Sequence, residues 1–142
     1  MSTQHSDPRV DRIIRFFEGI SPQDVARMGE FYTADARFKD PFNEVRGPEA
    51  IAKVFAHMYV ALEAPRFVVT AAVVEGSQCF LTWDFLFRFK RYAPAVEQRV
   101  KGASHLVFAA DGRIQFHRDY WDAAEELYEK LPGLGALMRW LK

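Results

Sequence analysis

The sequence predicts an α+β fold in which N-terminal helices cover one face of a strongly curved antiparallel sheet. Apolar residues recur at helical spacing in three segments of the first half, and four long segments with strand-like alternation follow. Consecutive strands joined by tight turns pair antiparallel, so the helices must cover one face of their sheet. Aromatic residues make up 15% of the chain and include thirteen Phe. We therefore expect a cone-shaped domain with an open mouth and an aromatic-lined cavity.

Three helices are expected before the long strands. Residues 1–8 read as a flexible tail and residues 9–18 as the first helix. Ser21 is a suitable N-cap for a second helix, because Pro follows it at the first helical position. A third helix is predicted over 48–63, where Pro again occupies the first position. The expected buried stripe of the second helix is Val25, Met28, Phe31 and Tyr32.

The strands follow from alternation and from turn residues. A short strand at 36–39 ends at Asp40, which precedes a proline and therefore favours extended backbone. The long strands are expected at 66–74, 78–92, 96–109 and 114–121. The Asp-Gly pair at 111–112 is typical of a hairpin turn between the last two. Asp122 is a suitable N-cap, and the apolar stretch 134–141 continues a predicted helical C-terminal tail.

Length and composition indicate one domain, which we place at residues 9–142 of the 142-residue chain. Nineteen basic residues balance nineteen acidic ones, and this zero net charge argues against a nucleic-acid partner. The single cysteine, Cys79, excludes an internal disulfide and a four-cysteine zinc site. We see no signal peptide in the polar first residues, and no apolar run approaches the ~20 residues of a membrane helix. We therefore expect a cytoplasmic protein without a membrane partner.

Several short motifs occur in a consistent order between residues 9 and 121. They are RFF at 15–17, FYTADA at 31–36, FKDP at 38–41, RGPEAI at 46–51 and the Asp-Gly turn at 111–112. Together with the order of helices and strands, they resemble the superfamily of ketosteroid isomerases and SnoaL-like polyketide cyclases. The resemblance implies the nuclear-transport-factor-like cone fold, whereas chemistry varies widely among proteins of this fold.

The resemblance also implies roles for individual residues. In ketosteroid isomerases the aspartate of the Asp-Pro pair is the general base that moves a proton between two carbons, and Asp40 matches it. The oxyanion hole of these enzymes uses a tyrosine and a protonated aspartate, whose positions hold Phe16 and Ser104 here. A supporting tyrosine of the third helix matches Phe55. Loss of one oxyanion donor raises a barrier by about 2.7–4 kcal/mol, so efficient isomerisation by the usual arrangement is not expected.

The last predicted strand adds three candidate residues. His117, Asp119 and Trp121 share one face, because side chains alternate along a strand. Related cyclases and epoxide hydrolases use acidic residues on late strands, so the resemblance implies such a role for Asp119. Because histidine suits proton transfer near neutral pH, the functional interpretation is an acid/base couple of Asp119 and His117 that faces Asp40 across the cavity. The alternative is a buried polar network that ties the last strand to the C-terminal helix. For Asp40 the alternative is an ordinary Asp-Pro surface turn.

The ligand site is expected to be apolar. The predicted ligand-binding residues are Phe16, Phe55, Trp83, Phe85, Ser104 and Trp121. Ordinary core packing is the alternative for these aromatic residues. His117 and Asp119 with His57 or His105 do not form a known metal pattern, and no phosphate loop or dinucleotide fingerprint occurs, so we predict no metal and no cofactor.

The main functional hypothesis is a small-molecule enzyme of the isomerase, cyclase or dehydratase type, acting by proton transfer at carbon beside a carbonyl. Asp40 would take the proton, and His117 or protonated Asp119 would stabilise the enolate oxygen, with Ser104 as a weak additional donor. One alternative is a non-catalytic module that binds a small apolar ligand. Another is a structural dimerising domain whose cavity is filled by Phe16, Phe55 and Trp83.

A homodimer is predicted through the outer face of the sheet and the C-terminal tail. The tail carries more apolar surface than a free helix normally leaves in water, and cyclic dimers dominate small oligomers. The alternative is that the tail folds over the mouth of its own cavity. The apolar residues concerned are Leu134, Leu137, Met138, Trp140 and Leu141.

Overall fold

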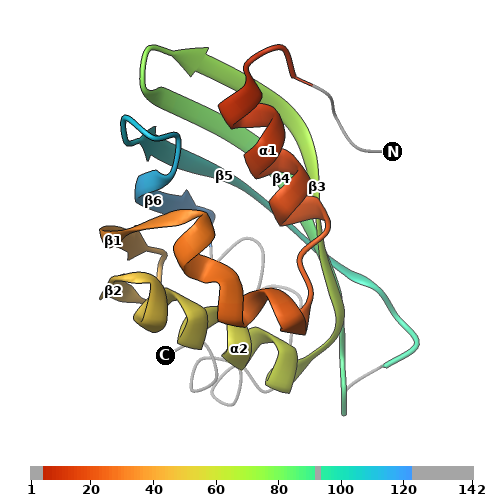
Figure 1. The fold of residues 1–142 in the computed structure, drawn as a ribbon. Helices are drawn as coiled ribbons and strands as arrows, with labels where there is room; N and C mark the ends of the chain where they lie inside the picture. The colour runs from red at the N-terminus through yellow and green to blue at the C-terminus, as the bar shows by residue number, and fades with distance from the viewer. Residues whose placement is uncertain (1–4, 92–93, 123–142) are drawn as a thin grey trace.

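The computed structural model describes residues 5–91 and 94–122, and Figure 1 shows their arrangement. In chain order the elements are α1 (Pro8–Glu18), the 3₁₀ helix η1 (Pro22–Glu30), β1 (Tyr32–Lys39), β2 (Glu44–Arg46), α2 (Pro48–Ala61), β3 (Leu62–Glu75), β4 (Gln78–Phe89), β5 (Gln98–Phe108) and β6 (Ile114–Tyr120). The predicted α+β class is confirmed. None of the helices in this part of the chain is long and apolar enough to span a membrane. The predicted C-terminal helices, beyond Asp122, lie outside the described residues.

The N-terminal helices begin where their capping residues place them. α1 starts at Pro8, one residue earlier than predicted, because the Asp7 side chain accepts a hydrogen bond from the backbone amide of Arg9. Ser21 and Asp24 form a capping box at the start of η1, in agreement with the predicted N-cap. Local sequence signals thus determine the starts of both helices.

The first two strands differ from the prediction. β1 begins at Tyr32 rather than Ala36, because Tyr32 pairs with Ile114 of β6. Tyr32 therefore belongs to the sheet and not to the apolar stripe of the preceding helix. The sequence does not predict β2, since a strand of three residues shows too little alternation.

The six strands form one sheet in the order β2-β1-β6-β5-β4-β3. The predicted antiparallel pairing holds for β3 with β4, β4 with β5 and β5 with β6. The short strand β2, which was not predicted, also pairs antiparallel, with β1. The prediction of an antiparallel sheet is wrong for β1 and β6, which run parallel. The reason is that no hairpin joins them: the chain passes through β2, α2 and the other strands between them, and parallel strands require such a crossover. The sheet is therefore mixed.

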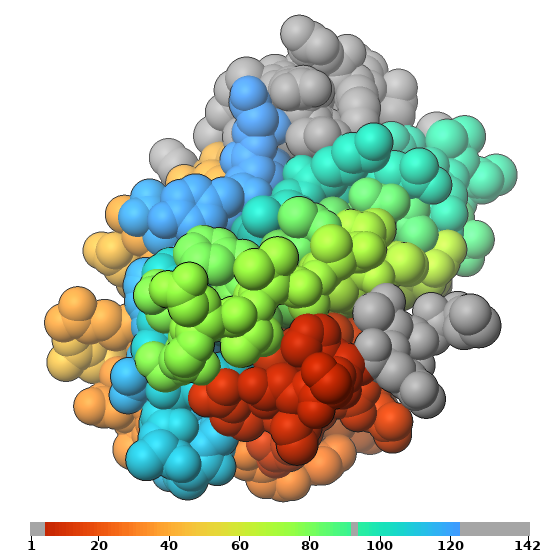
Figure 2. All heavy atoms as spheres, turned by 90° about the horizontal axis from the view of Figure 1, so that it is seen from above, coloured from red at the N-terminus to blue at the C-terminus, as the bar shows by residue number. Residues whose placement is uncertain are grey.

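Irregular pairing bends the sheet around the helices. The β3–β4 register shifts between Glu63 and Arg66 and again between Val69 and Ala71, and such bulges increase the bend and twist of a strand. Figure 1 shows the resulting curvature of β3 and β4. In Figure 2, α1 (red) lies against the β3–β4 hairpin (green). The Glu18 carboxylate fixes this contact by accepting a hydrogen bond of 2.9 Å from the Val69 amide.

The core lies between the helices and the inner face of the sheet. Ile13 and Ile14 of α1, Ile51 of α2, and Leu81 and Leu106 of the sheet are at most 1% exposed. Burial of each such side chain contributes about 1.5–3 kcal/mol to the hydrophobic stabilisation of the fold. This core holds the strands that present the cavity residues.

The homodimer remains a prediction, and the outer face of the sheet offers a residue with which to test it. Phe80 of β4 is 48% exposed, and its cross-strand partner Val73 of β3 is 65% exposed. If the dimer forms through this face, Phe80→Glu is expected to convert a dimer to a monomer in analytical ultracentrifugation at tens of micromolar. Val60→Glu, at an apolar site of α2 that is 71% exposed, should leave the dimer intact. A monomeric unmodified chain would reject the prediction.

Candidate active site

A cavity of about 380 Å³ lies between α2 and the inner face of the sheet. Its volume lies in the range of small-molecule sites, and its wall is mostly aromatic and aliphatic with a few polar groups. Phe55 and Trp83 line this cavity rather than fill it. The lining residues are Phe38, Asp40, Asn43, Val45, Ala50, Lys53, Val54, Phe55, His57, Met58, Phe67, Trp83, Phe85, Val100, Asp119 and Trp121.

Of the nine predicted site residues, six line the cavity, two line a recess beside it and one lies elsewhere. Asp40, Phe55, Trp83, Phe85, Asp119 and Trp121 all line the cavity. Ser104 and His117 line a recess of about 20 Å³ beside the cavity, and Trp83 and Asp119 line both spaces. Phe16 lies elsewhere, because its ring stacks on Phe31 in the core with centroids 3.8 Å apart. A direct contact between Phe16 and a ligand in the cavity is therefore not supported.

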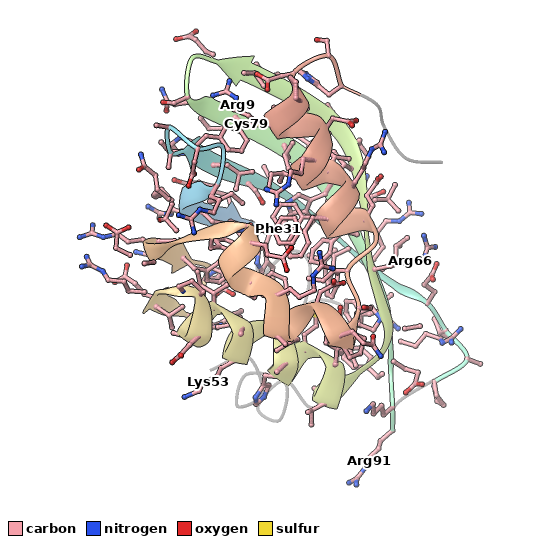
Figure 3. All side chains as sticks on the ribbon, in the orientation of Figure 1. Arg9, Phe31, Lys53, Arg66, Cys79 and Arg91 are labelled. Carbon is pink, nitrogen blue, oxygen red and sulfur yellow. The ribbon has the colours of Figure 1, made fainter. Side chains whose placement is uncertain are left out.

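One face of α2 supplies lining residues that the sequence analysis did not select. Lys53 and His57 are four residues apart and so lie on the same side of the helix. Both are exposed, and Figure 3 shows Lys53 at the outer edge of α2, pointing away from the sheet. The spacing of Ala50, Val54 and Met58 could have indicated that this helix face lines a cavity. Lys53 and His57 thus place two basic side chains at the rim of the cavity.

Asp40 sits at the end of β1 in a tight turn closed by its own side chain. Its Oδ1 accepts backbone hydrogen bonds from Phe42 at 2.8 Å and from Asn43 at 2.6 Å, and the Asn43 amide group reaches both carboxylate oxygens at 3.2 Å. Burial nevertheless raises the pKa of Asp40 above its ordinary value, because the hydrogen bonds only partly offset desolvation, and the charge of Asp119 raises it further. The turn thus fixes the orientation of the Asp40 carboxyl group, and burial makes this group more basic.

The raised pKa of Asp40 predicts how Asp40→Asn changes stability with pH. A carboxyl group whose folded pKa exceeds its unfolded value of about 3.9 destabilises the fold progressively as pH rises from that value through the folded pKa. The variant is therefore expected to gain melting temperature relative to the wild type as pH increases from 3.5 to 7.5. Asp35→Asn, on the exposed side of β1, is the control and should show no such trend. A relative melting temperature that falls with pH would contradict the prediction.

Asp119 is held at the centre of a chain of buried hydrogen bonds. Its Oδ1 accepts from Ser104 Oγ at 2.5 Å and lies 2.7 Å from His117 Nε2. Ser104 in turn accepts from the Trp83 indole at 2.9 Å. On the other side, His117 Nδ1 lies 2.8 Å from the Tyr32 hydroxyl. Two of these side chains, Ser104 and His117, are each only 3% exposed.

The hydrogen-bond partners in this network indicate which atoms carry the protons. If His117 carries its proton on Nε2, it donates to Asp119 and accepts from the Tyr32 hydroxyl at Nδ1. Each hydrogen-bond donor of this network then has an acceptor. Burial raises the pKa of Tyr32 well above its ordinary value, and the negative charge of Asp119 adds to this shift, so Tyr32 remains a donor. Sequence reasoning missed Tyr32 because it assigned this residue to a helix.

The same hydrogen-bond network determines which polar atoms are left to contact a ligand. Both ring nitrogens of His117 and the hydroxyl of Ser104 are occupied by the contacts above. Asp119 Oδ2 has no hydrogen-bond partner among the described residues, and Asp119 lines the main cavity. Within the described residues, Asp119 Oδ2 is therefore the oxygen of this network that is left to face the cavity, and His117 is linked to the cavity through Asp119.

Gly102 makes room for the Trp83 ring. Gly102 and Trp83 are cross-strand partners, and a Cβ at position 102 would clash with three carbons of the indole ring. Gly102→Ala is therefore expected to displace the indole, weaken its bond to Ser104, and destabilise the protein by about 1–3 kcal/mol in urea unfolding. Gly29→Ala is the matched control, since a Cβ there meets nothing within 4 Å. Equal stability of the two variants would show that Trp83 is not confined.

Within residues 5–91 and 94–122, no group of three or more His, Cys, Asp or Glu side chains is placed to hold a metal ion. His105 lies away from His117 and Asp119, because it hydrogen-bonds Gln78 and stacks on Phe80 on the outer face of the sheet.

The chain is similar to known proteins in sequence pattern and in structure. A family model described as a SnoaL-like domain matches residues 13–117. A protein with a ketosteroid isomerase-like fold from Catenulispora acidiphila, crystallised with trimethylamine, superposes with a TM-score of 0.75 at 19% identity, covering 90% of this chain and 96% of that one. No curated protein sequence matches.

Two further solved structures show the same architecture. A putative SnoaL-like polyketide cyclase from Jannaschia sp. has a TM-score of 0.69 at 21% identity, with 92% and 100% of the two chains covered. An epoxide hydrolase from Mycobacterium tuberculosis has a TM-score of 0.69 at 17% identity, with 92% and 95% covered. At these identities the structures establish a shared fold and leave the chemistry to the cavity residues.

Proposed function

This chain belongs to the SnoaL-like domain family, and we propose that it is a cofactor-independent enzyme that transfers a proton at a carbon atom beside a carbonyl group. The main support is that two carboxyl groups, Asp40 and Asp119, line one aromatic cavity. Proton transfer at such a carbon needs a base for the proton and a hydrogen-bond donor for the oxygen on which charge develops. A pair of carboxyl groups can supply both when one of them carries a proton.

Asp40 is the general base in this proposal. A base is most effective when its pKa lies near the working pH, and burial shifts the pKa of Asp40 upward, in that direction. Its Oδ1 is occupied by the backbone amides of Phe42 and Asn43, whereas Oδ2 accepts, among the described residues, only the 3.2 Å contact from the Asn43 side chain. Oδ2 is therefore the oxygen that would receive the proton.

Asp119 is the hydrogen-bond donor. Its Oδ1 accepts from Ser104 and His117, so a proton on the carboxyl group belongs on Oδ2, which would donate to the carbonyl oxygen of the substrate. The donor in this proposal is the protonated form of Asp119, whereas the added effect of its negative charge on the pKa of Asp40 and of Tyr32 belongs to the ionised form, and burial raises both pKa values in either form. Ser104 and His117 are positioning residues, because they orient this carboxyl group. This arrangement places the donor function on one carboxyl group, whereas the tyrosine positions of ketosteroid isomerases hold phenylalanine here.

The cavity walls favour a flat apolar substrate. Phe67 packs on Phe85 with ring centroids 4.6 Å apart and meets Trp83 edge-on at 5.6 Å. Rings in such a wall bind planar carbon skeletons through large contact areas. Substrates of the proposed enzyme are therefore enolisable cyclic ketones and lactones.

The proposal is tested by proton exchange. The wild-type protein in D₂O is incubated with a panel of enolisable cyclic ketones and lactones, and loss of the α-proton signal is followed by NMR. Exchange with at least one compound, faster than in buffer and slowed at least about 10²-fold in Asp40→Asn, is the expected result. No exchange with any compound, although one of them is bound in the cavity, would reject the enzyme and support the alternative of a non-catalytic binding module. The phenylalanines at positions 16 and 55 are the observation that favours this alternative.

A further inference from the structure

A second concavity lies on the outer face of the sheet, across β1, β2 and β6. Its volume is about 490 Å³. Phe38, Val45 and His117 form its floor and turn their side chains inward, so the walls come from the residues that alternate with them. These wall residues are Arg37, Lys39, Glu44, Arg46, Phe116 and Arg118, and we call the site the cationic groove.

The cationic groove places like charges opposite one another. Arg37 of β1 is the cross-strand partner of Arg46 of β2, and Lys39 of β1 is the partner of Arg118 of β6. Like charges directly opposite on one face destabilise a sheet. The groove has four cations and one acid, Glu44, in a chain of zero net charge. The fold thus concentrates positive charge here.

Little nearby negative charge compensates these cations. Glu44 lies 3.6 Å from Lys39. Arg37, Arg46 and Arg118 make no ion pair with a carboxylate among the described residues, whereas Arg9, Arg27 and Arg113 each do. Arg118 instead lies over the Tyr120 ring at 4.6 Å. Three guanidinium groups thus keep their hydrogen-bonding edges available within one concavity.

We propose that the cationic groove binds a small molecule that carries a diphosphate or two phosphate groups. Guanidinium groups bind phosphate oxygens through paired hydrogen bonds, and several of them around one concavity match a multiply charged anion better than a single carboxylate. A row of rings continues from the groove. The ring centroids of Phe116 and His105 are 5.4 Å apart, and the His105 ring stacks on Phe80 with centroids 4.4 Å apart. This row offers a surface for an apolar or planar part of the same ligand.

Protection of an exposed strand edge does not account for the cluster. Lys and Arg on an edge strand prevent pairing with other chains, and β2 is such an edge. However, β1 and β6 lie inside the sheet, paired on both sides, and they contribute three of the four cations. Edge protection would require charge on β2 alone.

Pyrophosphate is the probe for this site. At low salt, calorimetry is expected to detect saturable binding of pyrophosphate to the wild-type protein, and Arg37→Gln/Arg46→Gln should weaken it at least tenfold. Lys90→Gln/Arg91→Gln removes the same charge at the far end of β4, where Figure 3 shows Arg91 well away from β1 and β2, and should bind like the wild type. Without ligand, Arg37→Gln/Arg46→Gln should melt at the same temperature as the wild type or higher, because the repulsion between the two paired arginines is removed.

Three results would overturn the proposal. One is the absence of saturable pyrophosphate binding to the wild type, and another is equal weakening in both double variants, which would indicate a general charge effect. The third is binding of phosphatidylglycerol vesicles without binding of free pyrophosphate, which would assign the groove to a lipid surface. If the double variant does not fold, Arg46→Gln on the edge strand replaces it, with the same expected direction.

Discussion

Asp40→Asn is expected to lower kcat/KM for the exchanging ketone by about 10²–10⁴-fold, the usual contribution of a general base. An amide cannot accept the proton, although it can accept the backbone hydrogen bonds of the turn formed by Phe42 and Asn43. Asp119→Asn is expected to keep kcat/KM within about tenfold of the wild type, because an amide still donates a hydrogen bond to the oxygen of the substrate. The two substitutions are chemically identical, so their ranking separates base from donor.

The structure fixes how an asparagine at position 119 would lie. Ser104 and His117 both donate to Oδ1, so this position must hold the amide oxygen, and the amide nitrogen then takes the place of Oδ2 toward the cavity. Asp119→Leu removes the donor and should lower kcat/KM by about 10²–10³-fold. If Asp119→Asn abolishes exchange and Asp40→Asn preserves it, the two roles are exchanged. Melting curves of all three variants would check that each is folded.

Local sequence signals were sufficient to predict most of the fold. The capping residues Asp24 and Ser21, the Pro residues that begin helices, and the alternation along β3 to β6 all act within a few residues of each other. The parallel pairing of β1 with β6 could not be predicted in this way, because it joins segments separated by the whole of β2 to β5. Tyr32 was misassigned for that reason: its strand conformation depends on pairing with Ile114.

The candidate site could be predicted from the sequence where its residues lie on a single strand. Alternation along β6 correctly placed Asp119 and Trp121 at the cavity, with His117 on the same face. The hydrogen bond between His117 and Tyr32 joins residues 85 positions apart, and no sequence pattern records it. Phe16 was assigned to the ligand site by resemblance, but its ring stacks on Phe31. A matched position therefore does not guarantee that the side chain reaches the cavity.

The cationic groove illustrates a further limit of sequence reasoning. Its four cations come from three strands, and each strand alone presents an ordinary solvent-exposed charge. Only the register, which sets Arg37 opposite Arg46 and Lys39 opposite Arg118, brings like charges together. The same strands turn Phe38 and His117 inward. One set of strands thus builds an apolar cavity on one face and a charged groove on the other.

His117→Phe is expected to be the most destabilising single substitution in the hydrogen-bond chain, by about 2–5 kcal/mol in urea unfolding. A phenyl ring fits the space, since His117 already meets Phe38 edge-on at 4.8 Å and Phe17 at 5.5 Å. The loss comes from the two partners: the Tyr32 hydroxyl has no acceptor in a fully buried position, and Asp119 Oδ1 keeps only Ser104. Buried polar groups without partners account for the expected size of the effect.

A double-mutant cycle separates this cause from simple loss of packing. Tyr32→Phe removes the orphaned hydroxyl, so Tyr32→Phe/His117→Phe should be more stable than the sum of the single substitutions predicts, by about 0.5–3 kcal/mol. Tyr59→Phe is the matched control, because the buried Tyr59 hydroxyl has no hydrogen-bond partner among the described residues. Combined with His117→Phe it should be additive within about 0.5 kcal/mol. If Tyr32→Phe is additive as well, the Tyr32–His117 hydrogen bond does not contribute to stability, and the destabilisation by His117→Phe comes from lost packing and from Asp119.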